Sequence, residues 1–432
     1  MLKGTGIRIL SDKKRFIGIS VVVALMLFGD ALLYAVLPAR PEGFRVLVWQ
    51  IGILLGANRL IRIVTNELAG RLIKRVGSEK PLFLAVLIGS LTTMGYALPL
   101  GFWWLLSLRL VWGSCWSVLR AEGYLAAIDF SHSRNRGRVI GIYQTITRAG
   151  SGGGVLLGGF LTDLIGIPYT FFIYGLISLA SLSILFALAQ GIEPSASGEE
   201  EKEDKREEQE DEREAEGDTN ASDDEKKKSA PEGENFSKIN LLVKLIVWYG
   251  GMSMVLVEHM IVNLTGRIVA DSIIVNFNGL LGVSSLTGII LGFRSIGMLI
   301  MGPGFGALGD VVERKKLLSY SLAGELIVLL LMAVFRNWIS YLVLIVCFII
   351  FASANRIGMY ALMGEEVSAG NHGKARALHI NRFATFIDIG MFLGPVVGFF
   401  LYANYGLLSI LFLSMALLIP AFLGIITISR IE

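Results

Sequence analysis

The chain carries one pattern of apolar and glycine-rich stretches twice. Between Gly52 and Leu182 the first copy aligns on the second without a gap, so that Gly52 falls on Gly288, an offset of 236 residues. Charged residues follow the same offset, because Arg120 falls on Arg356. A repeat of this length predicts two similar halves in the folded protein.

Twelve stretches are long and apolar enough to cross a membrane as helices. Hydrophobic residues make up 53% of the chain and charged residues 17%, which excludes an ordinary soluble domain. A helix needs about 20 residues, at about 1.5 Å each, to cross roughly 30 Å of hydrocarbon. We therefore predict an all-α membrane protein whose twelve transmembrane helices form two pseudo-symmetric six-helix bundles. The stretches are 16–37, 46–69, 82–101, 103–127, 139–163, 168–190, 240–268, 279–306, 317–335, 338–362, 375–402 and 405–428.

A highly charged segment separates the two halves. Residues 199–228 contain 16 acids and 7 bases. Such a composition buries too little apolar surface to offset the entropy of ordering, so it predicts disorder. The domain organisation is then an N-terminal bundle over 1–190, a disordered cytoplasmic linker over 191–238 and a C-terminal bundle over 239–432. A regulatory tail is the alternative interpretation of the linker.

The lysines and arginines of the short connections predict the orientation. Eighteen of them fall on the side of the termini and three on the other, and cytoplasmic loops carry such an excess. We therefore expect both termini in the cytoplasm of a multi-pass protein of the cell (plasma or inner) membrane. The eighteen are Lys3, Arg8, Lys13, Lys14, Arg15, Arg71, Lys74, Arg75, Lys80, Arg134, Arg136, Arg138, Arg314, Lys315, Lys316, Lys374, Arg376 and Arg430, and the three are Arg40, Arg45 and Arg336.

No motif of cofactor or metal chemistry occurs in the sequence. There is no phosphate-binding loop, no paired CxxC and no HExxH, and the two cysteines lie inside predicted helices. We predict neither a cofactor nor a metal, no catalytic residue and no enzymatic activity. An energy source other than ATP, such as an ion gradient, is then required for any transport.

Several motifs of the chain resemble those of the major facilitator superfamily. They are the loops Gly70–Gly77 and Gly306–Lys315, the acid-to-RG segment Asp129–Gly141, the fourth-helix pattern Arg109–Gly113, and the glycine stripes Gly150–Gly159 and Gly390–Gly398. The order of these motifs along the chain and the twelve-helix frame resemble those of that superfamily. The pattern is closest to its drug:proton antiporter-like branch. The resemblance implies alternating access between the two halves.

Polar residues that occur in one repeat only are the candidates for coupling. An ionisable group at membrane depth costs about 2.5–3.5 kcal/mol on the insertion scale, so it needs a functional or structural reason. In the alignment of the two repeats, Asp30, Arg109 and Asp388 fall on glycine or isoleucine of the other copy. Glu258 lies beside His259 in the sequence. We assign proton coupling to Asp30, Arg109, Glu258 and Asp388; a purely structural ion pair is the alternative for each.

Polar residues three or four positions apart share one face of their helix. Such stripes must face water or each other rather than lipid, so we expect them to line a central cavity. The predicted substrate-binding residues are Asn58, Arg59, Arg62, Gln144, Arg148, His259, Asn263, Arg294, Asn381 and Arg382. The predicted gating residues at the cytoplasmic ends are Gly70, Arg75, Arg120, Asp129, Arg136, Asp310, Arg314, Arg356 and Glu365.

These residues suggest a secondary active transporter. Our leading interpretation is a proton-coupled antiporter that exports a small organic molecule, in which Asp30 exchanges the proton and Arg109 sets its affinity. The excess of arginines indicates an anionic substrate, although internal ion pairs would absorb part of that charge. A proton-coupled symporter that takes up an organic anion or a sugar-like nutrient is the alternative, followed by a receptor without transport. The expected partners are the substrate, protons and the lipid bilayer, with no nucleic acid, and the protein is expected to be a monomer.

The orientation can be tested by cysteine labelling. After replacement of Cys115 and Cys347, single cysteines at Gly43 and Ser229 are treated with an impermeant thiol reagent in intact cells. We expect Gly43→Cys to react and Ser229→Cys to stay unmodified, because the charge asymmetry places them on opposite sides. The reverse pattern would contradict the orientation.

Overall fold

The computed structural model describes residues 2–131, 135–190, 233–272, 282–295, 297, 312–335, 337–370 and 374–431, and these residues are helical apart from short connections. The predicted positions 191–232 of the linker and Asp310 of the second loop motif lie outside the described residues. Seven helices within the described ranges are long and apolar enough to cross a membrane.

The N-terminal half begins with the 38-residue helix α1. Its elements are α1 (Leu2–Ala39), the short 3-10 helix η1 (Pro41–Phe44), α2 (Val48–Val76), α3 (Glu79–Gly95), α4 (Phe102–Phe130), α5 (Arg136–Ile165), α6 (Ile167–Ala180) and α7 (Leu182–Gln190). Helices α6 and α7 together cover the sixth predicted stretch. Between α5 and α6 the chain turns at Gly166, whose φ of 89° favours glycine.

The C-terminal half repeats this order. Its elements are α9 (Gly233–Ser272), a helical segment over 283–295, α11 (Arg314–Val334), α12 (Trp338–Gly370) and α13 (Lys374–Ile431). Helix α9 starts inside the segment predicted as linker. Helix α13 holds the last two predicted stretches, which are divided at Gly406 by a non-helical backbone with φ 74°. The predicted all-α architecture of two helical bundles is confirmed.

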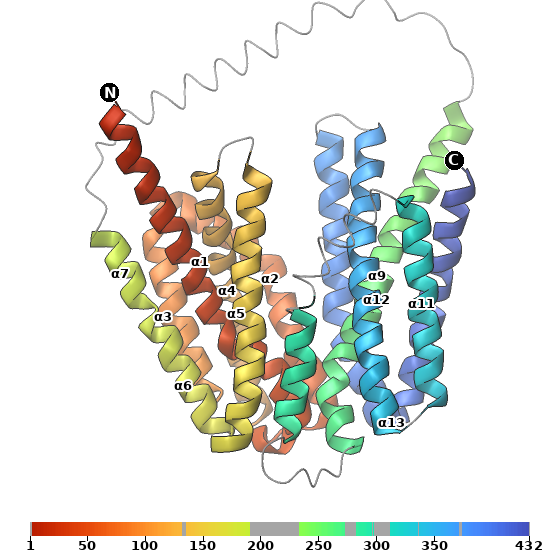
Figure 1. Ribbon diagram of the computed structural model, residues 1–432, viewed down its shortest axis with the longest axis horizontal. Helices are drawn as coiled ribbons and strands as arrows, with labels where there is room; N and C mark the ends of the chain where they lie inside the picture. The colour runs from red at the N-terminus through yellow and green to blue at the C-terminus, as the bar shows by residue number, and fades with distance from the viewer. Residues whose placement is uncertain are drawn as a thin grey trace, which may run out of the picture.

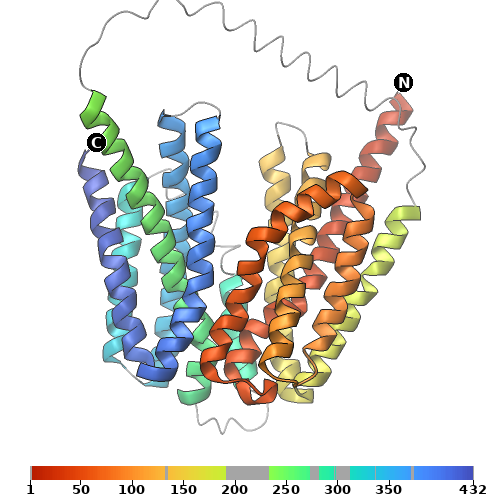
Figure 2. The same cartoon turned by 180° about the vertical axis from the view of Figure 1, so that it is seen from behind.

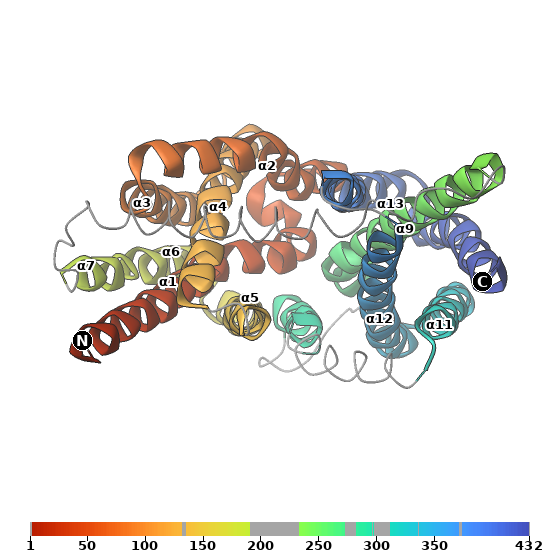
Figure 3. The same ribbon diagram turned by 90° about the horizontal axis from the view of Figure 1, so that it is seen from above.

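The two halves lie side by side, with both chain termini at the same end (Figures 1 and 2). We call this the inner end and the opposite one the outer end. The ribbons of the halves approach each other at the outer end and separate toward the inner end (Figure 1). Across the halves, α2 packs against α13 and α1 against α9, an arrangement that is also visible from above (Figure 3).

Glycines allow the halves to touch at the outer end. A Cβ on Gly52 of α2 would lie 2.5 Å from the carbonyl oxygen of Pro395 on α13. The positions related to these two by the repeat, Gly288 and Gly159, also meet, since a Cβ on Gly288 would lie 3.3 Å from the Cα of Gly159. Small residues permit this approach of helix backbones in lipid. The same pair of contacts therefore closes both sides of the interface.

Candidate functional site

A polar cavity of about 190 Å³ lies between the two halves. Helices α1, α2, α4 and α5 of the first half and α9 and the segment 283–295 of the second line it. Its lining includes seven predicted site residues, which are Asp30, Asn58, Arg59, Arg62, His259, Asn263 and Arg294, together with Tyr34, Trp112, Trp116, Ser151 and Ser295. The polar stripes of different helices therefore meet in one place.

Asp30 on α1 is held by two helices of the same half. The Arg109 guanidinium of α4 donates to its carboxylate in a salt bridge, and Asn58 Nδ2 of α2 donates over 3.3 Å. Arg109 is fully buried and also donates to Leu54 O over 3.1 Å and to the Tyr34 hydroxyl over 3.0 Å. The Asp30 side chain keeps 11% exposure. The arginine is thus fixed behind the acid, and the acid borders the cavity.

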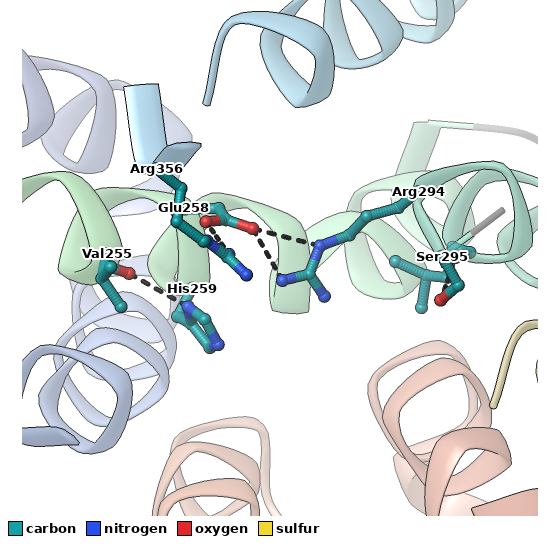
Figure 4. Close-up of polar contacts among 7 residues, drawn as sticks. Val255, Glu258, His259, Arg294, Ser295 and Arg356 are labelled. Carbon is teal, nitrogen blue, oxygen red and sulfur yellow. Dashed lines mark hydrogen bonds and ion pairs between the residues drawn. The ribbon is translucent and has the colours of Figure 1, made fainter. Parts of the chain in front are cut away.

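Glu258 on α9 forms the corresponding centre of the second half (Figure 4). Arg294 donates through Nε and a terminal nitrogen to Oε1, over 3.1 and 2.6 Å, and Arg356 of α12 donates to Oε2. The Glu258 side chain is 3% exposed, and its two arginines are about one-fifth exposed. Two cations on one buried acid keep Glu258 ionised and leave one positive charge in excess.

Three further arginines carry no ion pair or hydrogen bond within the described parts of the chain. Arg62 is 7% exposed, lines the cavity and has an unpartnered Nε. Arg59 lies close enough to repel it, and Arg148 on α5 lies within the field of Arg294 and Arg356. Buried charges are normally paired, so an arginine without an ion pair beside a cavity is a candidate for anion binding. The site as a whole is therefore electropositive.

The other predicted substrate and coupling residues are more scattered. His259 Nδ1 lies 3.0 Å from Val255 O of its own helix, and Asn263 is buried with an unpartnered Nδ2. Gln144 donates to the Tyr124 hydroxyl over 3.5 Å, and Arg382 stacks on Trp248 at 5.8 Å. Asp388 is half-buried and within the field of Arg62. The backbone of Asn381 is helical, and its side chain lies outside the described residues.

The predicted gating residues do not form one contact network within the described residues. Gly70 and Arg75 lie at the exposed inner end of α2, and Arg120 stacks on Tyr124 at 5.9 Å. Asp129 takes a salt bridge from Arg15 of α1 over 3.4 Å, and Arg356 pairs with Glu258 instead of an acid of the inner loops. The side chains of Arg136, Arg314 and Glu365 lie outside the described residues. Arg356 points to Glu258 because this acid supplies its counter-charge (Figure 4).

Asp163 closes the outer end, a role that our sequence interpretation missed. Its carboxylate accepts from Arg40, which follows the end of α1, over 2.5 Å and, across the halves, from the backbone N–H and the hydroxyl of Ser285 over 2.7 and 2.6 Å. Ser285 lies in the first turn of the segment 283–295, where unpaired N–H groups favour a carboxylate. The contact therefore joins α5 of one half to a helix start of the other.

Within the described ranges, no group of three or more His, Cys, Asp or Glu side chains could hold a metal ion. The cavity offers arginines, amides, hydroxyls and aromatic rings. Groups of these kinds can bind and orient a small charged molecule.

Two helical bundles around a charged central cavity define the architecture of secondary transporters. Residues 19–266 match the family model described as Major Facilitator Superfamily. This match covers more than half of the chain, and the chain belongs to that superfamily.

Individual relatives are distant. An uncharacterized MFS-type transporter of Enterobacter sp. (strain 638) is 27% identical over 164 residues, 38% of this chain and 42% of the relative. A probable vesicular acetylcholine transporter-B of Danio rerio is 27% identical over 200 residues, 43% of this chain and 40% of the relative. The matched regions thus span about two fifths of the length of these relatives.

Solved structures match over nearly the whole chain. The nucleoside transporter NupG superposes with a TM-score of 0.69 at 11% identity, over 95% of this chain and 98% of that one. A bacterial homolog of the human lysosomal transporter Spinster, in an inward-facing and unoccupied conformation, gives 0.67 at 14% identity over 97% of both chains. At these identities the likeness establishes the fold alone.

Loss of the Asp163 contact should let the outer end open. Asp163→Asn keeps the shape but removes the charge that Arg40 and the helix start require, so we expect a shift of about 1–2 kcal/mol, or roughly 5- to 30-fold in the ratio of open to closed states. The measurement is the labelling rate of a cavity cysteine at Asn263, in a background without Cys115 and Cys347, by an impermeant reagent added from the outer side.

Asp271→Asn is the matched control, because Asp271 also lies near the outer end but pairs with Arg267 and Tyr402 of its own half. It should leave the rate unchanged. Equal rates in wild type and Asp163→Asn would show that the glycine contacts alone hold the outer end closed.

Proposed function

We propose that the chain is a proton-coupled transporter of a small organic anion that works by alternating access, and that proton and anion move together. The observation that carries the proposal is a set of arginines without an ion pair, of which Arg59 and Arg62 line the cavity. Arg59, Arg62 and Arg148 have no acidic partner in the described part of the chain, whereas Asp30 and Glu258 are both engaged. An anion would supply the missing counter-charge.

The arrangement supports an anion with a planar or multiply charged acidic group. Guanidinium groups bind carboxylates and phosphates through two parallel hydrogen bonds. Arg62 of the first half and Arg294 of the second both line the cavity, so one ligand would contact both halves. The stacked rings of Trp112 and Trp116, 5.6 Å apart, offer a flat apolar wall for the rest of the molecule.

The same charges speak against transport of a cation. One relative is named as a probable transporter of acetylcholine, which carries a permanent positive charge. Arg59 and Arg62 would repel such a ligand in the cavity described above. The substrate of that relative is therefore not the substrate that we propose here.

The electrostatics of Asp30 determine the direction of coupling. Protonation of Asp30 removes a negative charge beside Arg109 and makes the cavity more positive, which favours anion binding. By linkage, a bound anion favours protonation to the same extent. Proton and anion then bind cooperatively, as symport into the cell requires. An antiporter instead needs the proton and the substrate to exclude each other.

Export by antiport is the second candidate, and the glycine stripe of α5 is the observation that favours it through family resemblance. The structure also gives these glycines a packing role, since a Cβ on Gly150 or Gly154 would lie 2.5 and 2.6 Å from the backbone of α1.

We place the protein in the cell membrane with both termini in the cytoplasm, as the charge asymmetry predicts.

Asp30→Asn tests the coupling. The neutral side chain imitates protonated Asp30, so anion affinity should become independent of pH, accumulation driven by a pH step in proteoliposomes should be lost, and downhill exchange should persist. Arg109→Ala should impair both modes because it leaves Asp30 buried without its cation. Glu67→Gln, an exposed acid of α2, is the control.

The wild-type protein distinguishes the two candidates. Symport predicts that anion affinity rises as the pH falls, and antiport predicts the opposite. Accumulation by Asp30→Asn equal to that of wild type would exclude Asp30 as the coupling residue.

Arg62→Gln tests the anion site. We expect small mono- and dicarboxylates and phosphate esters to stabilise the purified wild-type protein in a thermal-shift screen. Loss of a charge-assisted hydrogen bond of about 1.5–3 kcal/mol should weaken the apparent affinity roughly 10- to 100-fold. Arg71→Gln is the matched control, since Arg71 is exposed on the same helix and pairs with Glu67. Equal effects of both substitutions would locate the anion elsewhere.

A further inference from the structure

A second polar cluster lies between α11 and α12, apart from the lining of the cavity. The Ser321 hydroxyl of α11 donates to Asn355 Oδ1 of α12, and Asn355 Nδ2 donates to Glu325 Oε2, one helical turn after Ser321. Glu325 and Asn355 have no exposed surface, and Ser321 is 6% exposed. A buried acid thus occurs in the C-terminal half that the mechanism above does not use.

Glu325 has no cation beside it in the described residues. No salt bridge reaches its carboxyl group, and Oε1 has no hydrogen-bond partner. On the α12 side, the neighbour of Glu325 is the neutral amide of Asn355. Helix α13 also packs against α11, and none of its described residues places a charge near Glu325. The one described charge whose field reaches it is Glu258 of α9, which has the same sign.

An ionised carboxylate in this position would be expensive. Charges inside a membrane protein pair with an opposite charge or face water, and an isolated buried acid becomes neutral instead. Glu258 meets that requirement through two arginines, and Glu325 does not. We propose that Glu325 is a proton-binding site of the C-terminal half, occupied by a proton in the conformation described here, and that α12 links it to the ion pairs of Glu258.

The link is the position of two neighbouring residues on α12. Arg356 donates to Glu258, and the preceding residue, Asn355, donates to Glu325. Any displacement of α12 that withdraws Arg356 from Glu258 also moves Asn355. A substrate anion that recruits Arg294 and Arg356 would produce such a displacement. This coupling role rests on the proposed function, whereas the occupancy of Glu325 by a proton does not.

The repeat supports a role beyond the scaffold. Glu325 falls on Gly89 and Asn355 falls on Leu119 in the first half. The first half therefore builds the equivalent helix contact with apolar groups. A polar contact is not needed for this packing, so the acid requires another reason for its presence.

Infrared spectroscopy of the purified full-length protein tests the occupancy. A protonated carboxyl group has a C=O stretching band that a carboxylate lacks. Glu325→Gln keeps the shape and the acceptor for Asn355, so the fold is preserved. We expect the difference spectrum of wild type minus Glu325→Gln at pH 7 to contain this band. Carboxylate bands in its place would overturn the proposal.

Glu122→Gln is the matched control for the band. Glu122 of α4 is also fully buried, and both of its oxygens lack a partner in the described residues, but it lies in the other half. Its substitution should leave the Glu325 band in place. Loss of the Glu325 band in Glu122→Gln would mean that the assignment to Glu325 is wrong.

A pH titration of the band tests the link. Glu258→Gln removes a like charge and frees two arginines, so the Glu325 band should disappear at a pH lower by about 0.5–2 units. Asp30→Asn, in the other half, should leave the midpoint unchanged. An unchanged midpoint in Glu258→Gln would show that Glu325 is not coupled to Glu258. A Glu325 band at pH 7 in a protein whose transport does not depend on the pH gradient would refute the proposed function. The proton site at Glu325 would still stand.

Discussion

The structure depends on one constraint, that a charge at membrane depth must have a counter-charge or face the cavity. Each half satisfies it with an acid on its first helix, Asp30 on α1 and Glu258 on α9. The repeat places Asn58 and Arg294 at equivalent positions, and each contacts the acid of its own half. The second cation differs, since Arg109 and Arg356 are not repeat-equivalent. The halves therefore share the plan of their ion pairs but not the charge balance.

This difference explains why the cavity is asymmetric. Asp30 pairs with one arginine and accepts a hydrogen bond from an amide, so its negative charge is balanced by a single positive charge. Glu258 pairs with two arginines. Protonation of Asp30 therefore changes the balance of the cavity, and protonation of Glu258 is opposed by two cations. In the proposed mechanism, the N-terminal half supplies the acid that binds the proton, and the C-terminal half supplies positive charge for the ligand.

The sequence predicted the architecture better than the partners of individual side chains. The repeat and the length of the apolar stretches were sufficient for the two bundles, and helical spacing was sufficient to bring Asn58, Arg62 and His259 to one cavity. Pairing between helices depends on their rotation and tilt, which spacing does not determine. For this reason Arg356 was expected at an inner loop and lies against Glu258.

Asp163 and Glu325 were missed although the criterion for finding them was available. Asp163 falls on Phe399 and Glu325 falls on Gly89, so both occur in one repeat only, like Asp30. Asp163 was overlooked because it lies at the end of its apolar stretch, where a charge is expected to face water. Its partner is instead the start of a helix in the other half, a contact that no pattern within one half could indicate.

The charge surplus also bears on how an empty carrier avoids leaking protons. Arg59, Arg62, Arg148, Arg294 and Arg356 repel one another when the halves approach, and this repulsion grows as water leaves the cavity. A proton on Asp30 adds to it, so the protonated but empty cavity is the state least able to close. An anion between the arginines removes the repulsion and lets the inner end close. In the proposed mechanism, proton and substrate would thus cross together, because the anion offsets the positive charge that the proton adds.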